Sequence, residues 1–595
     1  MTDHSHLDRS ESPRSRGLAT AIPQRSGGWL ALALAFASLI SADLGTAQRP
    51  DTLAPTIIIA NARIYTLNSA QPWAEALAVK GERIVAVGSS AAILKMKQRT
   101  TTVIDARGKL LLPGFVDSHI HFMSGALSLD RVTLEGARDV AGIQQRLKRY
   151  ATTHPGTAWI EGRGWNYGMF GAVALPHKRD LDALFPARPV FLEGYDGHTS
   201  WANSAALRLA GITRDTPDPP NGVIVRDPAT REATGALKES ASRLVRRVVP
   251  PPSRATKRAA LLAGMRWANA HGITRVHSAG GDVPEFPLFD ELERERRLTV
   301  RFYMGMTISP PTLQPSAIDS IEALKTRYHS DWLSGGAAKL MIDGVIESHT
   351  AAMMGPYSDD TTRSGTPFWE RGAFEQAVAE LDRRGFQLFI HAIGDAGVGM
   401  TLDALEQAAL ANKTTGRRPR VEHIETISER DIPRFGPLGV IASMQPLHSY
   451  PDFNTTSVWA RNVGPERVQR SWVWNRIAAG GGRLTFGSDW PVVTLDPWLA
   501  IQTGVTRQTE QGMPPDGFIP SERLSVARAI DGYTLGAAYA GRRERDEGSV
   551  VVGKLADLIL VSQDLFTIQP SAIAETKVLL TMVGGKVVYR DTSRP

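Results

Sequence analysis

Short apolar runs rich in β-branched residues, separated by turn residues, lie near both ends of the chain. These runs cover 56–67, 76–88 and 102–112 near the start, and 556–562 and 577–590 near the end. Strand-rich segments at both ends of a long middle region are best explained if the ends pair with each other. We therefore predict one small composite β-sandwich made from residues 48–113 and 548–595.

The middle of the chain alternates apolar, β-rich runs with amphipathic helical segments. For example, the helical pattern of 375–385 leads into the strand-like run of 385–395. This alternation is typical of βα units and a parallel sheet. Over 114–547 its length suits a (β/α)8 TIM barrel, so we predict an α/β fold. The Pro- and Trp-rich stretch from about 145 to 260 predicts an insertion that covers one mouth of the barrel.

The N-terminal segment differs from the rest. Scattered arginines precede the apolar run 28–40, and small residues follow at Gly45-Thr46-Ala47. A basic region, a short apolar core and a small-residue exit indicate a secretory signal peptide at 1–47, with periplasmic or secreted localisation. The alternative is an uncleaved membrane anchor. We expect no stable membrane span after signal cleavage.

Composition narrows the function classes. Hydrophobic content of 42% and charged content of 22% indicate a globular protein, and the net charge of +7 is spread without a dense Lys/Arg block, so we expect no nucleic-acid partner. The absence of cysteine excludes disulfides, thiolate metal sites and a cysteine nucleophile. A metal ion would need His, carboxylate or modified Lys ligands. No Gly-rich nucleotide loop and no G-x-S-x-G elbow is present, which argues against a dehydrogenase and a serine hydrolase.

The strongest chemical signal is Pro113-GFVDSHIHF, an HxH pair at the end of a predicted strand. Side chains alternate faces along a strand, so Asp117, His119 and His121 point the same way. Two imidazoles at this spacing are suited to one metal ion. The alternative is a pair of structural histidines at a strand end.

Four further polar residues end or interrupt separate apolar runs: Lys339, His391, His423 and Asp489. The separation of His391 from His423 is that of one βα unit, and that of His423 from Asp489 is two. With HxH on strand one, these residues fall on strands four, five, six and eight, whose carboxyl ends share one face of a barrel. They form a mixed nitrogen and oxygen set suited to one or two divalent ions, for which zinc is expected.

The chain resembles the amidohydrolase superfamily, and within it the YtcJ-like group, or amidohydrolase family 3, which includes N-substituted formamide deformylases. The resemblance implies a barrel with a composite β-sandwich, one ion held by the HxH pair and Asp489, and a second held by His391 and His423. It also implies a carboxylated Lys339 between them, although Glu347 or Asp343 are alternative sources of that carboxylate. The motifs that carry it are Pro113-GFVDSHIH, His391-AIGD, Val421-EHIE, Gly487-SDWPV and Gly553-KLADLILV.

These residues predict a metal-dependent amidohydrolase that breaks a non-peptide C–N bond, amide or formamide-like, in a small molecule. Asp489 is expected to act as both ligand and general base, because a bound ion brings the pKa of water towards 7. His198 is the second catalytic candidate, placed to contact the substrate or the developing oxyanion. The candidate substrate contacts are Trp165, Tyr167, His448 and Glu347.

Two other interpretations stay open. The same metal site suits a cyclic-amide, carbamate or ester hydrolase, and a barrel that has lost activity would be an exported binding protein. A homodimer is a further possibility, which apolar sandwich edges favour.

Overall fold

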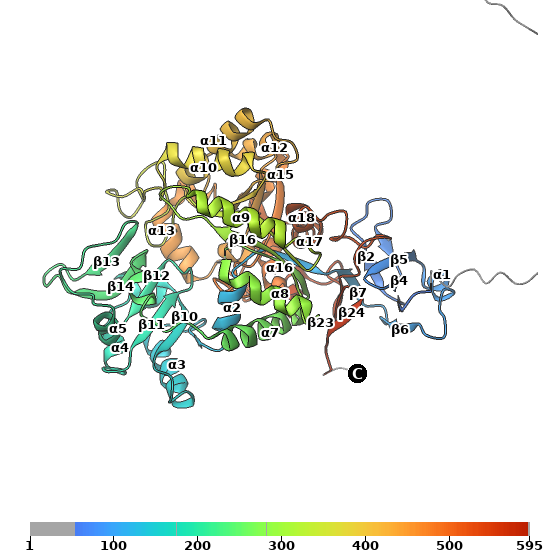
Figure 1. Ribbon diagram of the computed structural model, residues 1–595, viewed down its shortest axis with the longest axis horizontal. Helices are drawn as coiled ribbons and strands as arrows, with labels where there is room; N and C mark the ends of the chain where they lie inside the picture. Colours follow the sequence, from blue (N-terminus) through green and yellow to red (C-terminus); the bar gives the residue numbers. More distant parts are fainter. Residues whose placement is uncertain (1–53, 174, 281–282, 593–595) are drawn as a thin grey trace, which may run out of the picture. The chain divides into compact units, whose positions relative to one another are not determined.

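In the computed structural model, residues 54–173, 175–280 and 283–592 are described, and the predicted signal peptide lies outside them. Eight parallel strands form one sheet in the order β21-β20-β19-β18-β17-β16-β15-β8. Figure 1 labels β16 of this sheet and many of the helices around it. The strands are β8 (Phe115–Ile120), β15 (Ile273–Ser278), β16 (Arg301–Thr307), β17 (Leu333–Met341), β18 (Gln387–Ala392), β19 (Arg420–His423), β20 (Ile441–Met444) and β21 (Arg483–Phe486). Ser118 Oγ in β8 donates to Phe486 O in β21 at 2.8 Å, which joins the first strand to the last. The predicted (β/α)8 barrel is confirmed.

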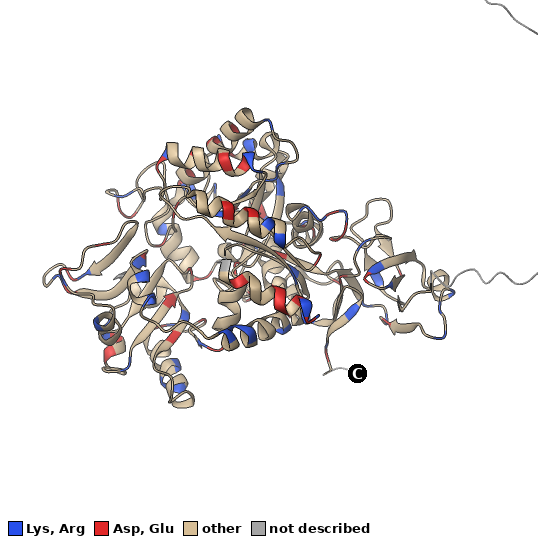
Figure 2. Ribbon diagram, viewed as in Figure 1, with Lys and Arg blue, Asp and Glu red and all other residues tan. Residues whose placement is uncertain are grey.

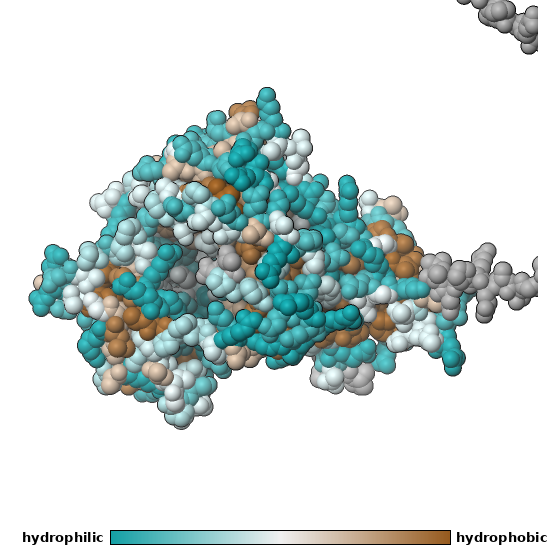
Figure 3. Space-filling model, viewed as in Figure 1, coloured by the Kyte–Doolittle hydropathy of each residue, from teal (hydrophilic) through white to brown (hydrophobic). Residues whose placement is uncertain are grey.

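Helices surround the barrel. They include α2 (Phe122–Ser128), α7 (Arg254–Ala270), α8 (Phe286–Arg294), α9 (Pro315–Arg327), α10 (Arg371–Arg383), α11 (Asp395–Asn412), α12 (Phe435–Leu438), α15 (Trp474–Ala479), α16 (Pro497–Thr506), α17 (Val526–Tyr533) and α18 (Leu535–Ala540). In α8, Phe286, Phe289 and Leu292 face the core, because residues three or four apart share one side of a helix. Charged residues of both signs lie along the visible helices (Figure 2), and the surface there is largely hydrophilic (Figure 3).

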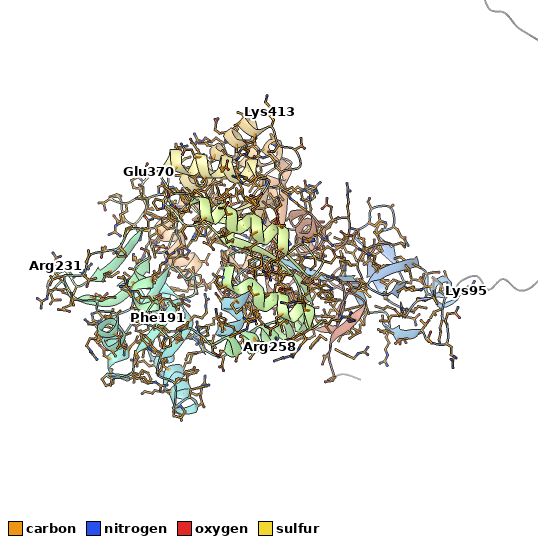
Figure 4. All side chains as sticks on the ribbon, viewed as in Figure 1. Lys95, Phe191, Arg231, Arg258, Glu370 and Lys413 are labelled. Atoms are coloured by element: carbon orange, nitrogen blue, oxygen red, sulfur yellow. The ribbon has the colours of Figure 1, made fainter. Side chains whose placement is uncertain are left out.

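Ion pairs tie neighbouring helices together on this outer surface. Arg258 of α7, labelled in Figure 4, donates to Glu291 of α8 at 2.7 Å. Such exposed pairs add little stability individually. Among the described residues, no helix combines the length and the apolar character that a membrane crossing requires.

The two ends of the described chain pair in space, as predicted. One sheet, in the order β5-β4-β1-β6, consists of β1 (Ile57–Ala60), β4 (Ala76–Lys80), β5 (Arg83–Gly88) and β6 (Thr102–Asp105). The other, in the order β24-β23-β22-β7-β2-β3, consists of β2 (Arg63–Tyr65), β3 (Trp73–Ala74), β7 (Leu110–Pro113), β22 (Leu558–Val561), β23 (Val578–Val583) and β24 (Lys586–Arg590). The N-terminal β7 runs antiparallel to the C-terminal β22, with Leu112 opposite Ile559. Ile64, Val79 and Met582 are buried together in the core of this unit.

Two stretches that the pattern predicts as single strands are each divided between the two sheets. Residues 56–67 become β1 and β2, with Asn61 between them at φ 54°. Residues 102–112 become β6 and β7, with Arg107 at φ 50° and Gly108 at φ 75°. A residue in the left-handed region turns the chain sharply, so each long run crosses from one sheet to the other.

The insertion forms a sheet of its own between α2 and α7, in the order β13-β14-β12-β11-β10-β9. Its elements are β9 (Val132–Thr133), α3 (Val140–Thr153), β10 (Ile160–Trp165), α4 (Arg179–Asp182), β11 (Val190–Gly194), β12 (Thr199–Ala202), α5 (Ser204–Leu209), β13 (Gly222–Arg226), β14 (Ala233–Glu239) and α6 (Ser242–Arg246). The sheet therefore starts earlier than the predicted limit of about 145. The turn between β11 and β12 brings Tyr195, Asp196 and His198 to a cavity at the barrel mouth.

Candidate metal centre

The HxH pair lies at the carboxyl end of β8, where the chain turns into α2. His119 is fully buried, whereas the side chain of His121 is 37% exposed. Asp489 follows β21 and places Oδ1 at 3.2 Å from His121 Nε2 and 3.5 Å from His119 Nε2. β8 and β21, the first and last strands of the barrel, are neighbours in the closed sheet, so His119 and Asp489 meet although they lie far apart in sequence.

Two residues of the site have unusual backbone conformations. Asp489 has φ 60° and His423 has φ 78°, in the left-handed region that non-glycine residues rarely adopt. Such conformations cost about 1–3 kcal/mol each and persist where the surroundings over-determine them. Asp489 N donates to His119 O at 2.7 Å, which anchors this turn to the first strand.

A second close group forms around the other oxygen of Asp489. Asp489 Oδ2 lies 3.5 Å from His448 Nε2 and 3.8 Å from His423 Nδ1. His448 belongs to η4 (Pro446–Ser449), the turn after β20. Among the described residues, the groups compact enough for one ion are His119, His121 and Asp489, and His423, His448 and Asp489. His448, predicted as a substrate contact, thus joins the potential ligands.

Lys339 and His391 line the same cavity from β17 and β18. Lys339 Nζ lies 3.4 Å from His119 Nε2. His391 Nε2 donates to Gly344 O at 3.2 Å, and its ring centre is 4.5 Å from that of His423. His391 is outside both compact groups, although its Nδ1 stays available on the ring.

Burial sets the protonation states of these groups. It lowers the pKa of His119 to about 4, and it lowers the pKa values of His391 and His423 well below the usual histidine range. Burial likewise lowers the pKa of Lys339 to about 8. Burial alone would raise the pKa of Asp489, but the imidazoles around it outweigh this effect and hold it well below its usual value. Neutral imidazoles beside a carboxylate are the forms that bind metal.

Buried partners orient the histidines, and the sequence analysis missed them. His119 Nδ1 donates to Glu422 Oε2 at 2.5 Å, and Arg420 donates to the same carboxylate at 2.8 Å. His423 Nδ1 donates to Gln445 Oε1 at 2.8 Å. These bonds leave Nε2 of both imidazoles as the lone-pair nitrogen. The feature that could have indicated these partners is the pair of charged residues Arg420 and Glu422 in β19, a strand in which every residue is buried.

His198 reaches the cavity from the insertion and is fixed by Glu239. Its Nδ1 lies 2.9 Å from Glu239 Oε2, and its ring centre is 5.6 Å from that of His391. Burial opposes the charged form, but Glu239 outweighs this and raises the pKa of His198 to about 9. His198 is therefore a cation at neutral pH whose Nε2 remains free to donate.

Glu347 also lines the cavity, 8% exposed. It accepts hydrogen bonds from Tyr195 Oη and from Asn454 Nδ2, the latter at 3.2 Å. Burial, together with the nearby charge of Glu425, raises the pKa of Glu347 to about 8. Glu425, another cavity residue that the sequence analysis missed, accepts from Trp459 Nε1 at 2.8 Å.

Trp165 and Tyr167 do not reach the cavity, contrary to expectation. Both are 0% exposed and pack in the insertion's own core. Trp165 Nε1 donates to Leu192 O at 3.3 Å, and Tyr167 Oη donates to Asp196 at 2.7 Å. A buried aromatic ring stabilises its own sheet, so these two form no wall for a substrate.

The donor set fits divalent metal ions. It combines neutral imidazoles with a carboxylate, as zinc and similar ions prefer. Asp489 Oδ1 and His448 Nε2 are buried and lack a hydrogen-bond partner. Unsatisfied buried polar atoms are costly, and a coordinated ion would satisfy both.

Comparison with known proteins agrees with this geometry. The model of the amidohydrolase family matches residues 102–589. The chain belongs to the amidohydrolase family. This amidohydrolase is 33% identical over 552 residues to Protein LONG AFTER FAR-RED 3 of Arabidopsis thaliana, covering 91% of the chain and 92% of that protein.

Two further relatives are similar over nearly their whole length. The putative amidohydrolase YtcJ of Bacillus subtilis is 30% identical, covering 89% of this amidohydrolase and 98% of YtcJ. The N-substituted formamide deformylase of Arthrobacter pascens is 26% identical, covering 90% and 98%. An uncharacterized metal-dependent hydrolase from Pyrococcus horikoshii OT3 superposes with a TM-score of 0.68 at 25% identity, covering 86% of the chain and 99% of that structure. Together with the cavity geometry, these similarities support a metal-dependent amidohydrolase.

Proposed function

We propose that this amidohydrolase hydrolyses a non-peptide C–N bond of a small amide, formamide-like in type, with zinc as its ion. The observation that carries the proposal is the position of Asp489. Its two carboxylate oxygens lie 3.2–3.5 Å from Nε2 of His119, His121 and His448. The named activity of the Arthrobacter pascens relative supports the choice of bond.

The residues would hold metal in two sets that share Asp489. His119 and His121 would form the first set, and His423 the second, with His391 or His448 as its further ligand. Lys339, whose Nζ lies 3.4 Å from His119 Nε2, would supply a further ligand in a carboxylated form. A bound divalent ion supplies Lewis acidity and lowers the pKa of water.

The chain's own groups move the protons. Asp489 lines the cavity and would accept a proton from the attacking water, then pass it to the leaving nitrogen. His198, a cation held by Glu239, would donate from Nε2 to the substrate oxygen as negative charge develops there. The insertion, which carries His198, thereby completes a site built on barrel strands.

Metal content and activity of matched variants test the proposal. Protein purified without chelators should hold one or two zinc-like ions per chain and release formate from a panel of N-formyl amines. Asp489→Asn and His121→Ala should lose metal or activity, whereas the surface controls Asp319→Asn and His329→Ala should keep both. A parent that binds no metal under any loading condition would refute the proposal and favour a binding protein.

We also propose that the chain is exported with residues 1–47 as its signal peptide, supported by their sequence pattern. Fractionation of expressing cells tests this: the mature chain should leave the cytoplasm, and a variant lacking 1–47 should not. Retention in membranes after carbonate extraction would instead favour an anchor.

A further inference from the structure

A second chamber of about 430 Å³ adjoins the metal cavity. Tyr195, His448 and Val492 line both spaces, so the two are neighbours across these side chains. One wall comes from the insertion, including Glu135 and Asn166, and the other from barrel loops. A substrate whose reacting bond lies beside Asp489 would therefore extend past Tyr195 and His448 into this chamber.

Part of the barrel side of the chamber is apolar. Leu447 and Val492 contribute to it, with Val493 and Leu499 beside them. Leu447 is buried and the other three are partly buried. Contiguous aliphatic side chains favour a hydrocarbon group on the ligand, because contact removes apolar surface from water.

The polar part of the chamber is acidic. The carboxylates of Glu135, Asp452 and Glu510 line it, and no lysine or arginine does so among the described residues. The charges of Arg163 and Arg146 compensate Glu135 in part. Burial raises the pKa values of Glu135 and Asp452, so a bound cation would relieve an existing electrostatic cost.

One ring marks a place for that cation. Tyr450 lines the chamber together with Asp452 and Glu510, and its Oη accepts a hydrogen bond from Glu510 N at 3.3 Å. Burial raises the pKa of Tyr450, and the charges of Glu510 and Asp452 add to the rise. An aromatic ring with two carboxylates in the same chamber suits an ammonium group.

We propose that the chamber binds the amine side of the substrate, and that this side is an aliphatic chain ending in a protonated amine, as in an N-acylated diamine. The inference rests on the proposed amide hydrolysis. The reacting carbonyl lies in the metal cavity, the chain contacts Val492 and Leu447, and the ammonium lies by Tyr450, Asp452 and Glu510. An anionic end group would be repelled by the same carboxylates.

Three formamides of matched length test the preference: N-formylhexane-1,6-diamine, N-formylhexylamine and 6-formamidohexanoate. With the metal-loaded parent, kcat/KM should be highest for the cationic diamine derivative, lower for the neutral hexylamine derivative and lowest for the anionic hexanoate. In Glu510→Gln the ratio of kcat/KM for the cationic formamide to that for the neutral one should fall about two- to fivefold, as expected for loss of one exposed ion pair. The control Glu293→Gln, in α8 and outside the chamber lining, should leave this ratio unchanged. Equal rates for cation and neutral, or a ratio unaffected by Glu510→Gln, would overturn the inference.

Calorimetry separates this inference from the proposed function. Hexylamine should bind the metal-loaded chain more tightly than hexan-1-ol, and Glu510→Gln should weaken hexylamine binding about two- to fivefold. If no formamide is hydrolysed but hexylamine binds in this way, the amide reaction is wrong and the chamber assignment holds. If formamides are hydrolysed and hexylamine binds no better than the alcohol, the chamber assignment is wrong and the reaction stands.

Discussion

Replacing Glu422 by glutamine isolates the support behind the metal centre. Glu422 is 0% exposed and touches no cavity. Its Oε2 accepts from His119 Nδ1 at 2.5 Å and from Arg420 at 3.0 Å, while Oε1 accepts from Arg420 at 2.8 Å. Glutamine keeps the shape but removes the negative charge and offers one acceptor oxygen in place of two.

The expected loss of stability follows from the partners that Arg420 keeps after the substitution. Arg420 keeps only neutral partners, Ser118 O, Ser443 Oγ and His277 Nδ1, so its charge stays buried without a compensating carboxylate. Breaking a buried ion pair in this way costs about 3–5 kcal/mol of unfolding free energy. Loss of the carboxylate behind a ligating histidine should also weaken metal binding about 10- to 100-fold, which is about 1.4–2.8 kcal/mol.

Two measurements check this: a metal titration against a competing chelator, and urea unfolding of the metal-free protein. The matched control is Glu544→Gln, which breaks a partly exposed pair with Arg418 at 2.8 Å. That change should cost no more than about 1 kcal/mol and leave metal affinity unaltered. If Glu422→Gln were to bind metal like the parent while folding normally, Glu422 would not orient His119 and the reasoning would fail.

Three further predictions concern close packing, metal linkage and pH. In Gly487→Ala the added Cβ would lie 2.4 Å from His119 N, so the backbone that carries this ligand must shift. We expect kcat/KM to fall about 100-fold while the circular dichroism spectrum stays unchanged. Activity near that of the parent would contradict this packing. Removing the ion with a chelator should lower the free energy of unfolding by about 4 kcal/mol, relative to protein in a free ion concentration of about a thousand times the Kd. A thermal midpoint that does not change when zinc is added would show that no such site forms. Burial and the charge of Glu425 raise the pKa of Glu347 to about 8 from its ordinary value of 4.5. Between these values the folded state binds more protons than the unfolded state, so stability falls as pH rises. Urea unfolding at pH 5 and pH 9 should show a smaller loss for Glu347→Gln than for the parent, and equal losses would disprove the shift.

The insertion makes the active site depend on two separately packed units. His198 and Tyr195 come from the turn between β11 and β12, whose sheet has its own core around Trp165. The catalytic candidate Asp489, in contrast, is fixed to the barrel by its hydrogen bond to His119 O. Changes in the core of the insertion should therefore affect activity through His198 while leaving the ligands on the barrel in place.

Sequence pattern alone was sufficient for the barrel and for the convergence of its polar strand ends. Alternation of side chains puts His119 and His121 on one face, and parallel strands bring their carboxyl ends together whatever lies between them. For that reason Lys339, His391, His423 and Asp489 were expected around one cavity, and the structure brings them there. Periodicity is a local property, so a single sequence reveals it.

Tertiary structure decided which side chains meet across the barrel and what the aromatic residues do. Glu422 contacts His119 across 303 positions in sequence, and only barrel closure and register make them partners. Trp165 and Tyr167 looked suited to a substrate, yet both are buried in the core of the insertion. A residue's type determines what it can bind, but its burial and its partners depend on packing between distant segments, which local pattern does not encode.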